Sequence, residues 1–265
     1  MDIKQLLEKY TYGERDFRGA ILIGIQLNGV DLSSVDLSGA NLINADLQEA
    51  DLSEADLTGV NLINANLSGA DLSGSDLSRA YLNGAKLVGA YLNRTHLINT
   101  YLSGANLIYT KLIGANLTGA NLTNVKLINA NLTRAILTNT NLTGVNLIGA
   151  DLKSANLLGA DLRGANLSGT LIDETTQLSD KWRLVQEIVT QGAIERDLRY
   201  ADLKETNLIG ANLTRANLSH ADLSGSNLSG IYLTDTIVEN AKFFNVVGLS
   251  AEAKLNLKQR GAILD

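Results

Sequence analysis

The sequence predicts an all-β solenoid, in which the chain winds into stacked coils around a leucine core. Every fifth residue from Leu22 to Leu167 is leucine, and with Phe17 this makes 31 consecutive repeats of five residues. A second run of ten repeats carries Leu, Val or Phe at the same position from Leu198 to Phe243. Proline is absent and glycine occurs 24 times, which suits an unbroken hydrogen-bond ladder with sharp corners.

A period of five fits neither an α-helix nor a free-standing strand. Leucines five residues apart would wind around a helix without forming an apolar stripe. The residues between them are mainly Asn, Asp, Ser, Thr and Gly, which favour turns. We therefore expect a short extended piece and a corner in each repeat, with backbone hydrogen bonds from coil to coil at roughly 4.8 Å. Each coil then buries its neighbours, and no central globular core is needed.

The commonest repeat reads Ala-(Asp/Asn)-Leu-X-X, as in residues 40–44 and 115–119. This motif resembles that of the pentapeptide-repeat family, and the resemblance covers about residues 15–245. It implies a right-handed quadrilateral β-helix of pentapeptide repeats, with four repeats or about 20 residues in each coil. It also implies that the central Leu and the preceding Ala face inward. The residues one before, one after and two after the Leu would face outward, where stacked Asn and Asp could form hydrogen-bonded ladders.

Short capping helices are expected at both ends, because a bare solenoid end exposes unpaired strand edges. The N-terminal segment places four apolar side chains on one helical face, with Asp2 as N-cap; they are Ile3, Leu6, Leu7 and Tyr10. At the other end Ser250 is the expected N-cap and Gly261 the stop. Ile263 and Leu264 would then fold back on this helix.

The five-residue phase slips by one between Ile172 and Leu198. Within this gap the sequence has helical periodicity, with Ser179 or Asp180 as N-cap and Gly192 as stop. Its apolar side chains are Trp182, Leu184, Val185, Ile188 and Val189. The segment after this helix, residues 195–199, nearly repeats residues 14–18. Two interpretations remain open: one continuous rod with the helix packed along it, or two stacks that meet at an angle.

The expected organisation has five parts, with one helical insertion between two solenoid runs. They are an N-terminal helical cap (1–12), a β-helix of about eight coils (13–174), the helical insertion (175–196), a second run of about two and a half coils (197–247) and a C-terminal helical cap (248–265). This layout resembles the cyanobacterial members of the family, in which helix-capped stacks are common.

The net charge of −6 conceals a gradient along the chain. Residues 1–76 hold 13 acidic and 4 basic residues, whereas residues 77–174 hold 4 acidic and 8 basic ones. The acidic balance argues against direct nucleic-acid binding through phosphate contacts. No apolar stretch approaches the length of a membrane span, and the N-terminus lacks the pattern of a signal peptide. We therefore expect a cytoplasmic protein that binds neither nucleic acid nor membrane.

Catalytic and metal chemistry find little support in the sequence. Cysteine is absent, which excludes disulfides and thiolate sites. The two histidines, His96 and His220, lie in separate runs and are expected to be surface residues of the ladder. No nucleophile and base have a recognisable spacing, and carboxylates on a convex rod lack the concave site that catalysis needs. We expect a protein that is not an enzyme and that has no cofactor or metal.

The first candidate surface is acidic. Four repeats to a coil would stack residues 20 apart into outward ladders on two neighbouring sides: Asp36, Asp56 and Asp76 after Asp16, flanked by Asp31, Asp51 and Asp71. Counting Asp46, Glu49 and Glu54 as well, nine carboxylates lie between Arg18 and Arg79. Over ~15 Å they compare with ~9 phosphates on the same length of duplex DNA. Some members of the pentapeptide-repeat family mimic DNA and bind DNA gyrase. The simpler interpretation is a solvated Asp ladder that aids solubility.

The second candidate surface is apolar and aromatic. Val88, Ile108, Ile128 and Ile148 each follow a central Leu on one side of the coil and would form an exposed stripe for a partner. A shorter ladder on the neighbouring side contains Ile23, Ile43 and Ile63. Tyr81 over Tyr101 could anchor a protein partner. The simpler interpretations are that β-branched residues suit extended backbone, that the inserted helix covers part of the stripe, and that the tyrosines stack within their ladder.

The sequence thus leads to two hypotheses of different classes. The first is a non-enzymatic rigid solenoid that serves as a protein-interaction module for an unknown protein partner, as a monomer or weak dimer. The alternative is an acidic DNA-mimic regulator of a type II topoisomerase such as DNA gyrase. Inhibition of supercoiling that weakens as salt rises would favour the alternative, because salt screens charge contacts.

Overall fold

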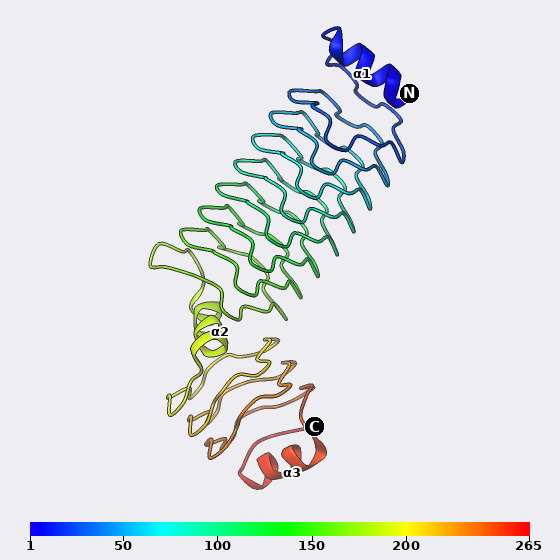
Figure 1. The fold of residues 1–265 in the computed structure, drawn as a ribbon. Coiled ribbons are helices and arrows are strands. Elements are labelled where there is room, and N and C mark those ends of the chain that lie inside the picture. Colours follow the sequence, from blue (N-terminus) through cyan, green and yellow to red (C-terminus); the bar gives the residue numbers. More distant parts are fainter. The chain divides into compact units, whose positions relative to one another are not determined.

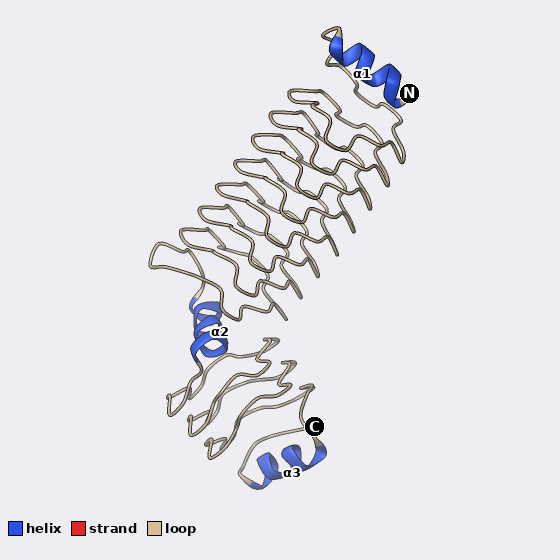
Figure 2. Cartoon of the chain, in the orientation of Figure 1, coloured by secondary structure: helices blue, strands red, loops and turns tan.

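The computed structural model describes residues 1–265 as two compact units, which we treat separately (Figure 1). Unit 1 comprises Met1–Asp161 and Leu171–Gln177, and unit 2 comprises Leu162–Thr170 and Leu178–Asp265. Three helices are present: α1 (Ile3–Thr11), α2 (Asp180–Gln191) and α3 (Ala251–Gln259). The rest of the chain winds in coils whose sides are too short to be drawn as strands (Figure 2).

The coils are held together by parallel pairing between residues 20 apart. Asp36 pairs with Asp56, and Asp56 with Asp76, and the same step recurs on all four sides. The central N–H donates to the next coil, as from Leu37 to the Asp56 carbonyl at 2.8 Å. The N–H before the central residue donates to the previous coil, as from Asp56 to the Val35 carbonyl at 2.9 Å. The predicted β-helix of four repeats per coil is therefore confirmed.

We label the four sides of each coil in unit 1 as A to D in chain order, so that Leu37, Leu42, Leu47 and Leu52 are central residues of sides A, B, C and D. The central leucines and the small residues two positions before them are buried, as the family resemblance implied. Burying one leucine contributes roughly 1.5–3 kcal/mol. Where Thr or Ser replaces the small residue, its hydroxyl is satisfied, as from Thr95 Oγ1 to the Leu72 carbonyl at 2.7 Å.

Each side ends at a corner with left-handed backbone, two residues after the central Leu. Gly74 has φ +71°, but Glu54 and Arg94 adopt similar values of 56° and 57°. A non-glycine residue in this conformation is uncommon, yet the solenoid requires it at every corner. Long side chains at the corners therefore project from the edges of the coil.

One backbone N–H in each repeat, that of the residue after the central Leu, has no backbone acceptor. The Asp or Asn before the Leu supplies it: Ser53 N–H donates to Asp51 Oδ1 at 2.9 Å, and Ile43 N–H to Asn41 Oδ1 at 3.2 Å. This local bond explains the Asp/Asn of the motif. The expected ladder bonding between stacked Asp and Asn side chains is rare; Asn66 Nδ2 donates to Asp46 Oδ1 at 3.1 Å.

Helix α1 caps the first coil of unit 1. Asp2 accepts the Gln5 N–H at 2.8 Å and donates its own N–H to Gln5 Oε1 at 3.3 Å, which confirms the predicted N-cap. Leu6 is the residue of the expected apolar face that is fully buried. The Tyr10 hydroxyl donates to the Ser33 carbonyl at 2.9 Å and fastens the helix to side D.

The phase slip is accommodated at one corner of unit 1. Gln177 pairs with Asn156, which is 21 rather than 20 residues earlier. The extra residue bulges out, and Asp173 Oδ1 accepts the N–H groups of Ser154, Thr175 and Thr176 at 2.9–3.1 Å. Burial acts to raise the pKa of Asp173, but these hydrogen bonds outweigh it and hold the pKa far below its ordinary value.

Unit 2 contains α2 and the second run of repeats. Trp182, Val185 and Ile188 are buried as expected, and Gly192 ends the helix with φ +79°. Ser179 occupies the N-cap position, but neither the Ser179 nor the Asp180 side chain makes the expected capping bond. Gln186 is buried as well, because its Nε2 donates to the Thr170 carbonyl at 2.8 Å.

Helix α3 caps the last coil of unit 2. Ser250 Oγ accepts the Ala253 N–H at 3.1 Å, as predicted for an N-cap. Gly261 follows the helix with φ +90°, and Ile263 then pairs with Lys242. The chain end thus adds one more ladder contact, which covers the open edge of the solenoid.

Candidate interaction surfaces

The acidic ladders lie where the sequence predicted them. Asp36, Asp56 and Asp76 stack on side A, and Asp31, Asp51 and Asp71 stack on side D. Each carboxylate accepts the N–H of the residue two positions later, at 2.8–3.0 Å. These aspartates therefore have a structural role in the repeat whether or not they also bind a partner.

The side A ladder begins with Asp16, whose carboxylate is paired with Arg18. Hydrogen bonds from the Arg18 guanidinium and backbone lower the pKa of Asp16 to about 2, and Arg18 also lies 3.5 Å from Asp36. The Ser33 N–H and hydroxyl, with a smaller contribution from Tyr10, lower the pKa of Asp31. Beyond Asp36 the acidic residues up to position 76 have no ion pair, because no basic residue occurs between Arg18 and Arg79.

A complementary basic zone follows on the next coils of unit 1. No acidic residue occurs between Asp76 and Asp151, whereas six basic residues do: Arg79, Lys86, Arg94, Lys111, Lys126 and Arg134. None of the six makes an ion pair. The overall charge gradient was visible in the sequence, but the missing pairs become evident only when residues 20 apart are stacked.

The residues of the predicted apolar stripe stack on side C, but they are less exposed than expected. Val88, Ile108 and Ile128 are half-buried against one another, and Ile148 at the end of the ladder is 38% exposed. Tyr109, at the corner beside Ile108, is 56% exposed. Lys86 and Lys126 lie on the same side, two residues before members of the stripe. The side therefore presents a narrow apolar ladder with a basic margin.

Tyr81 and Tyr101 stack on side B with their ring centroids 5.1 Å apart and their planes within 5°. Their exposed fractions are 43% and 44%. Arg79 and Asn99, from the neighbouring corner, help to line an open groove of about 410 Å³ beside them. The tyrosines and the isoleucine stripe thus lie on adjacent sides of the coil, and the structure does not bring them together into one patch.

Five consecutive repeats give up the local Asp/Asn bond described above. The residues before the central Leu in these repeats are Tyr81, Lys86, Tyr91, His96 and Tyr101. The N–H groups that follow, on Asn83, Val88, Asn93, Ile98 and Ser103, make no hydrogen bond. A typical hydrogen bond contributes about 0.5–1.5 kcal/mol, so this belt sacrifices local stability. The absence of Asp and Asn at these five positions is visible in the sequence, but only the structure shows that it costs a backbone hydrogen bond in each repeat.

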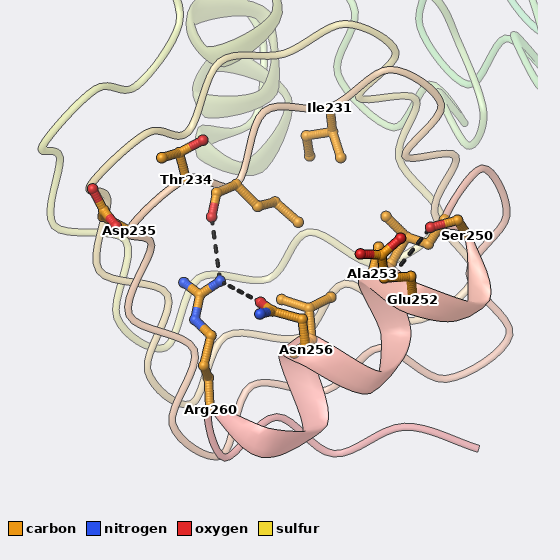
Figure 3. Close-up of a pocket in the computed structure, with 11 residues that line it drawn as sticks. Ile231, Thr234, Asp235, Ser250, Glu252, Ala253, Asn256 and Arg260 are labelled. Atoms are coloured by element: carbon orange, nitrogen blue, oxygen red, sulfur yellow. Dashed lines mark hydrogen bonds between the residues drawn. The ribbon is translucent and has the colours of Figure 1, made fainter.

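A hollow with a volume of about 590 Å³ lies beneath α3 in unit 2 (Figure 3). Asn256 from α3 and Arg260, the residue that follows it, face Ile231 and Thr234 from the last coil. The Arg260 guanidinium donates to Asn256 Oδ1 at 3.0 Å and to the carbonyl groups of Leu233 and Thr236. The arginine therefore donates to backbone carbonyls at the end of the coil, where no further coil stacks, and the hollow is a consequence of capping.

Other polar groups offer no assembled chemistry. His96 is exposed on side A, and His220 stacks on Tyr200 with ring centroids 4.9 Å apart. No group of three or more His, Asp or Glu side chains is placed to hold a metal ion. No helix is both long and apolar enough to cross a membrane.

Comparison with known proteins decides the family. The model of the pentapeptide repeats family matches residues 16–48, 36–74, 75–108, 100–139, 130–169 and 197–230. The chain belongs to the pentapeptide-repeat family. Its fold is accordingly the right-handed quadrilateral β-helix of that family, with short helices at the ends and one helical insertion.

Among solved structures, HetL from the cyanobacterium Nostoc sp. strain PCC 7120 is 34% identical, over 92% of this chain and 97% of HetL, with a TM-score of 0.44. HetL is a pentapeptide repeat protein involved in heterocyst differentiation regulation. A pentapeptide repeat protein from the Arabidopsis thaliana thylakoid lumen is 32% identical, over 46% of this chain and 77% of that protein, with a TM-score of 0.36.

QnrB1, a plasmid-mediated fluoroquinolone resistance protein, is 17% identical over 91% of this chain and 94% of QnrB1, with a TM-score of 0.25. No curated protein matches the chain. The family model identifies a repeat module and leaves its partner open.

Proposed function

We propose that this pentapeptide-repeat protein is a rigid, non-enzymatic interaction module whose partner docks on side C of unit 1. The observation that carries the proposal is the unbroken ladder of Val88, Ile108, Ile128 and Ile148. Earlier coils carry Gln48 and Ser68 at this position of side C, so an apolar residue is not required by the coil. A continuous apolar ladder on an outer surface is characteristic of an interaction site.

The margin of this ladder indicates the chemistry of the partner. Lys86 and Lys126 have no acidic neighbour to pair with. A partner surface with an apolar centre and acidic edges would pair with both features, and such edges raise the association rate as well as the specificity. The proposal is therefore a protein partner with an acidic, partly apolar surface. The cytoplasmic location expected from the sequence stays a prediction.

The test is capture of the partner by variants of the purified chain. The double variant Ile108→Lys, Ile128→Lys places two charges in the centre of the ladder and should abolish capture. Its matched control is Ile43→Lys, Ile63→Lys, which makes the same change in the half-buried ladder of side B and should capture as wild type does. Equal capture by both double variants would remove side C from consideration.

The acidic ladders support a second candidate, a DNA-mimic regulator of a type II topoisomerase. The supporting observation is the absence of ion pairs on the acids beyond Asp36. Asn can replace Asp without loss of the local N–H bond, as Asn41 and Asn61 show. The variant Asp36→Asn, Asp56→Asn should therefore fold normally. If the second candidate is right, wild type inhibits supercoiling by purified gyrase in a salt-sensitive manner and this variant inhibits less.

A further inference from the structure

The acidic and basic zones of unit 1 meet on the same surface. Side D carries Asp31, Asp51 and Asp71, then Tyr91, then Lys111. The adjoining corner between sides D and A carries Glu54, then Gly74, then Arg94, and later Arg134. As far as Arg134, the charge along this surface therefore changes sign once, between the coils of Leu72 and Leu92. Side B has no such change, because its outer ladders in coils up to Thr143 are uncharged.

A hollow marks the point at which the sign changes. It has a volume of about 350 Å³ and is lined by Glu54, Ser73, Gly74, Asn93, Arg94 and Ile113. Gly74 opens this hollow, because a Cβ at this position would overlap Glu54 Oε1. The Glu54 carboxylate thus lies over Gly74. Arg94 lies one coil beyond Gly74 and makes no ion pair with an acidic residue.

We infer that this surface, side D with its D/A corner, is a self-association surface that pairs two copies of the chain in antiparallel fashion. A surface that is acidic in one half and basic in the other is complementary to itself after a two-fold rotation. One contact then pairs the unpaired acids of this surface with Arg94 and Lys111, whereas an acidic partner protein would account for these two basic residues alone. This surface is separate from the ladder on side C, so the two proposals can fail independently.

The register follows from the position of the sign change. A two-fold axis that lies in the interface, across the long axis and between the coils of Leu72 and Leu92, sets Asp51 opposite Lys111 of the second copy. The same axis sets Glu54 within about one coil, ~4.8 Å, of Arg94 of the second copy. Tyr91 then lies against Asp71 of the second copy, where the Tyr91 hydroxyl can donate a hydrogen bond to the Asp71 carboxylate.

The repeats on this surface support a functional role. Tyr91 and Lys111 stand where the motif has Asp or Asn, and with Tyr91 the local bond to the Asn93 N–H is lost. For Lys111 the loss is offset, because Asn93 Oδ1 from the previous coil accepts the Ile113 N–H at 3.2 Å. Residues that interrupt the stabilising motif at the centre of the charge change are expected if the surface binds something.

The size of the surface limits the strength of the pairing. About five coils span ~24 Å, and one side of a coil is narrow, so the contact stays below the ~1,200 Å² that standard interfaces bury. The dimer should therefore be weak and sensitive to salt, since the screening length falls from ~10 Å at 0.1 M to ~3 Å at 1 M.

The experiment uses the full chain in sedimentation velocity, with two variants that are complementary to each other. The acid-reversed variant is Glu54→Arg, Asp51→Asn, in which Asn preserves the local N–H bond. The base-reversed variant is Arg94→Glu, Lys111→Glu. Each variant opposes like charges in its own homodimer and should sediment as a monomer. An equimolar mixture sets the arginine introduced at position 54 of one variant against the glutamate introduced at position 94 of the other. It also leaves the unchanged Glu54 and Asp51 of one chain opposite the unchanged Arg94 and Lys111 of the other. Because this restores the attraction, the mixture should dimerise as wild type does at low salt.

The matched control is Lys86→Glu, Lys126→Glu, which makes the same change of net charge on side C and should leave the dimer intact. Circular dichroism melts check that every variant keeps the wild-type fold. Three results would overturn the inference: a wild type that stays monomeric at high concentration and low salt, single variants that dimerise as wild type does, or a mixture that remains monomeric. The salt dependence of dimerisation by wild type tests the inference without any variant.

Discussion

The inward leucine ladder makes a quantitative prediction at Leu107, in the middle of unit 1. Its side chain is fully buried, and it stacks between Leu87 and Leu127 of the neighbouring coils. Leu107→Ala removes buried methyl groups and leaves a cavity that the rigid coils cannot close, which should destabilise the unit by about 2–5 kcal/mol. Leu107→Asp adds an unpaired buried charge, worth several kcal/mol more. The sum approaches the roughly 5–15 kcal/mol that stabilises typical domains.

The assay is thermal and denaturant unfolding followed by far-ultraviolet circular dichroism. We expect the Ala variant to unfold at a lower midpoint and the Asp variant to lack cooperative β structure. Ile108→Asp, one residue later but outward, provides the control and should retain the coils. An Asp variant at position 107 that melts like wild type would mean that the leucine is not in the core, and the inward assignment would have to be abandoned.

Three further predictions follow from particular contacts. Trp182→Ser with Val185→Ser should melt α2 but leave unit 1 folded, because solenoid coils depend mainly on their neighbours; loss of all β structure in circular dichroism would contradict this. Asp173→Ala should lower the melting temperature more than Asp173→Asn, because Asn can still accept the corner N–H groups. The pKa of Asp173 in the folded protein is held below its ordinary 3.8, so the stability from its charge is present above pH 3.8 and is lost as the pH falls toward the folded pKa. Melting curves of wild type across about pH 2–5 would detect this loss. Gly248→Ala should destabilise by about 2–4 kcal/mol, because its Cβ would overlap the Ser229 backbone nitrogen at φ +89°; Gly39→Ala, with φ +66° and open space, should lose about 1 kcal/mol, and equal losses would refute the clash.

The fold could be predicted because one periodic signal determines it. A leucine at every fifth position assigns each side chain to the core or the surface, and Asp2, Ser250 and Gly192 mark helix ends by local chemistry that needs no tertiary information. The sequence does not reveal what packing decides. Ser179 stands at the predicted N-cap position but makes no capping bond, and Gln186 is buried because a carbonyl 16 residues away accepts its amide N–H.

The candidate surfaces could be predicted as ladders, because stacking follows directly from four repeats per coil. Their chemistry could not be predicted in full. The role of Asp51 as acceptor for the Ser53 N–H depends on a backbone geometry that composition does not reveal. Likewise, the hollow at Gly74 exists because the Glu54 side chain leans over the next coil, and this depends on a rotamer and a corner conformation.

The central claim is that a protein partner docks on the apolar ladder of side C, and the most direct test is its dissociation constant once the partner has been captured. Titration calorimetry would compare wild type with the side C variant Ile108→Lys, Ile128→Lys and the side B variant Ile43→Lys, Ile63→Lys. Loss of two central residues of an interface should cost at least about 2 kcal/mol, or about 30-fold in affinity, whereas the side B variant should bind as wild type does. An unchanged dissociation constant for the side C variant, with binding lost in Asp36→Asn, Asp56→Asn instead, would contradict the account.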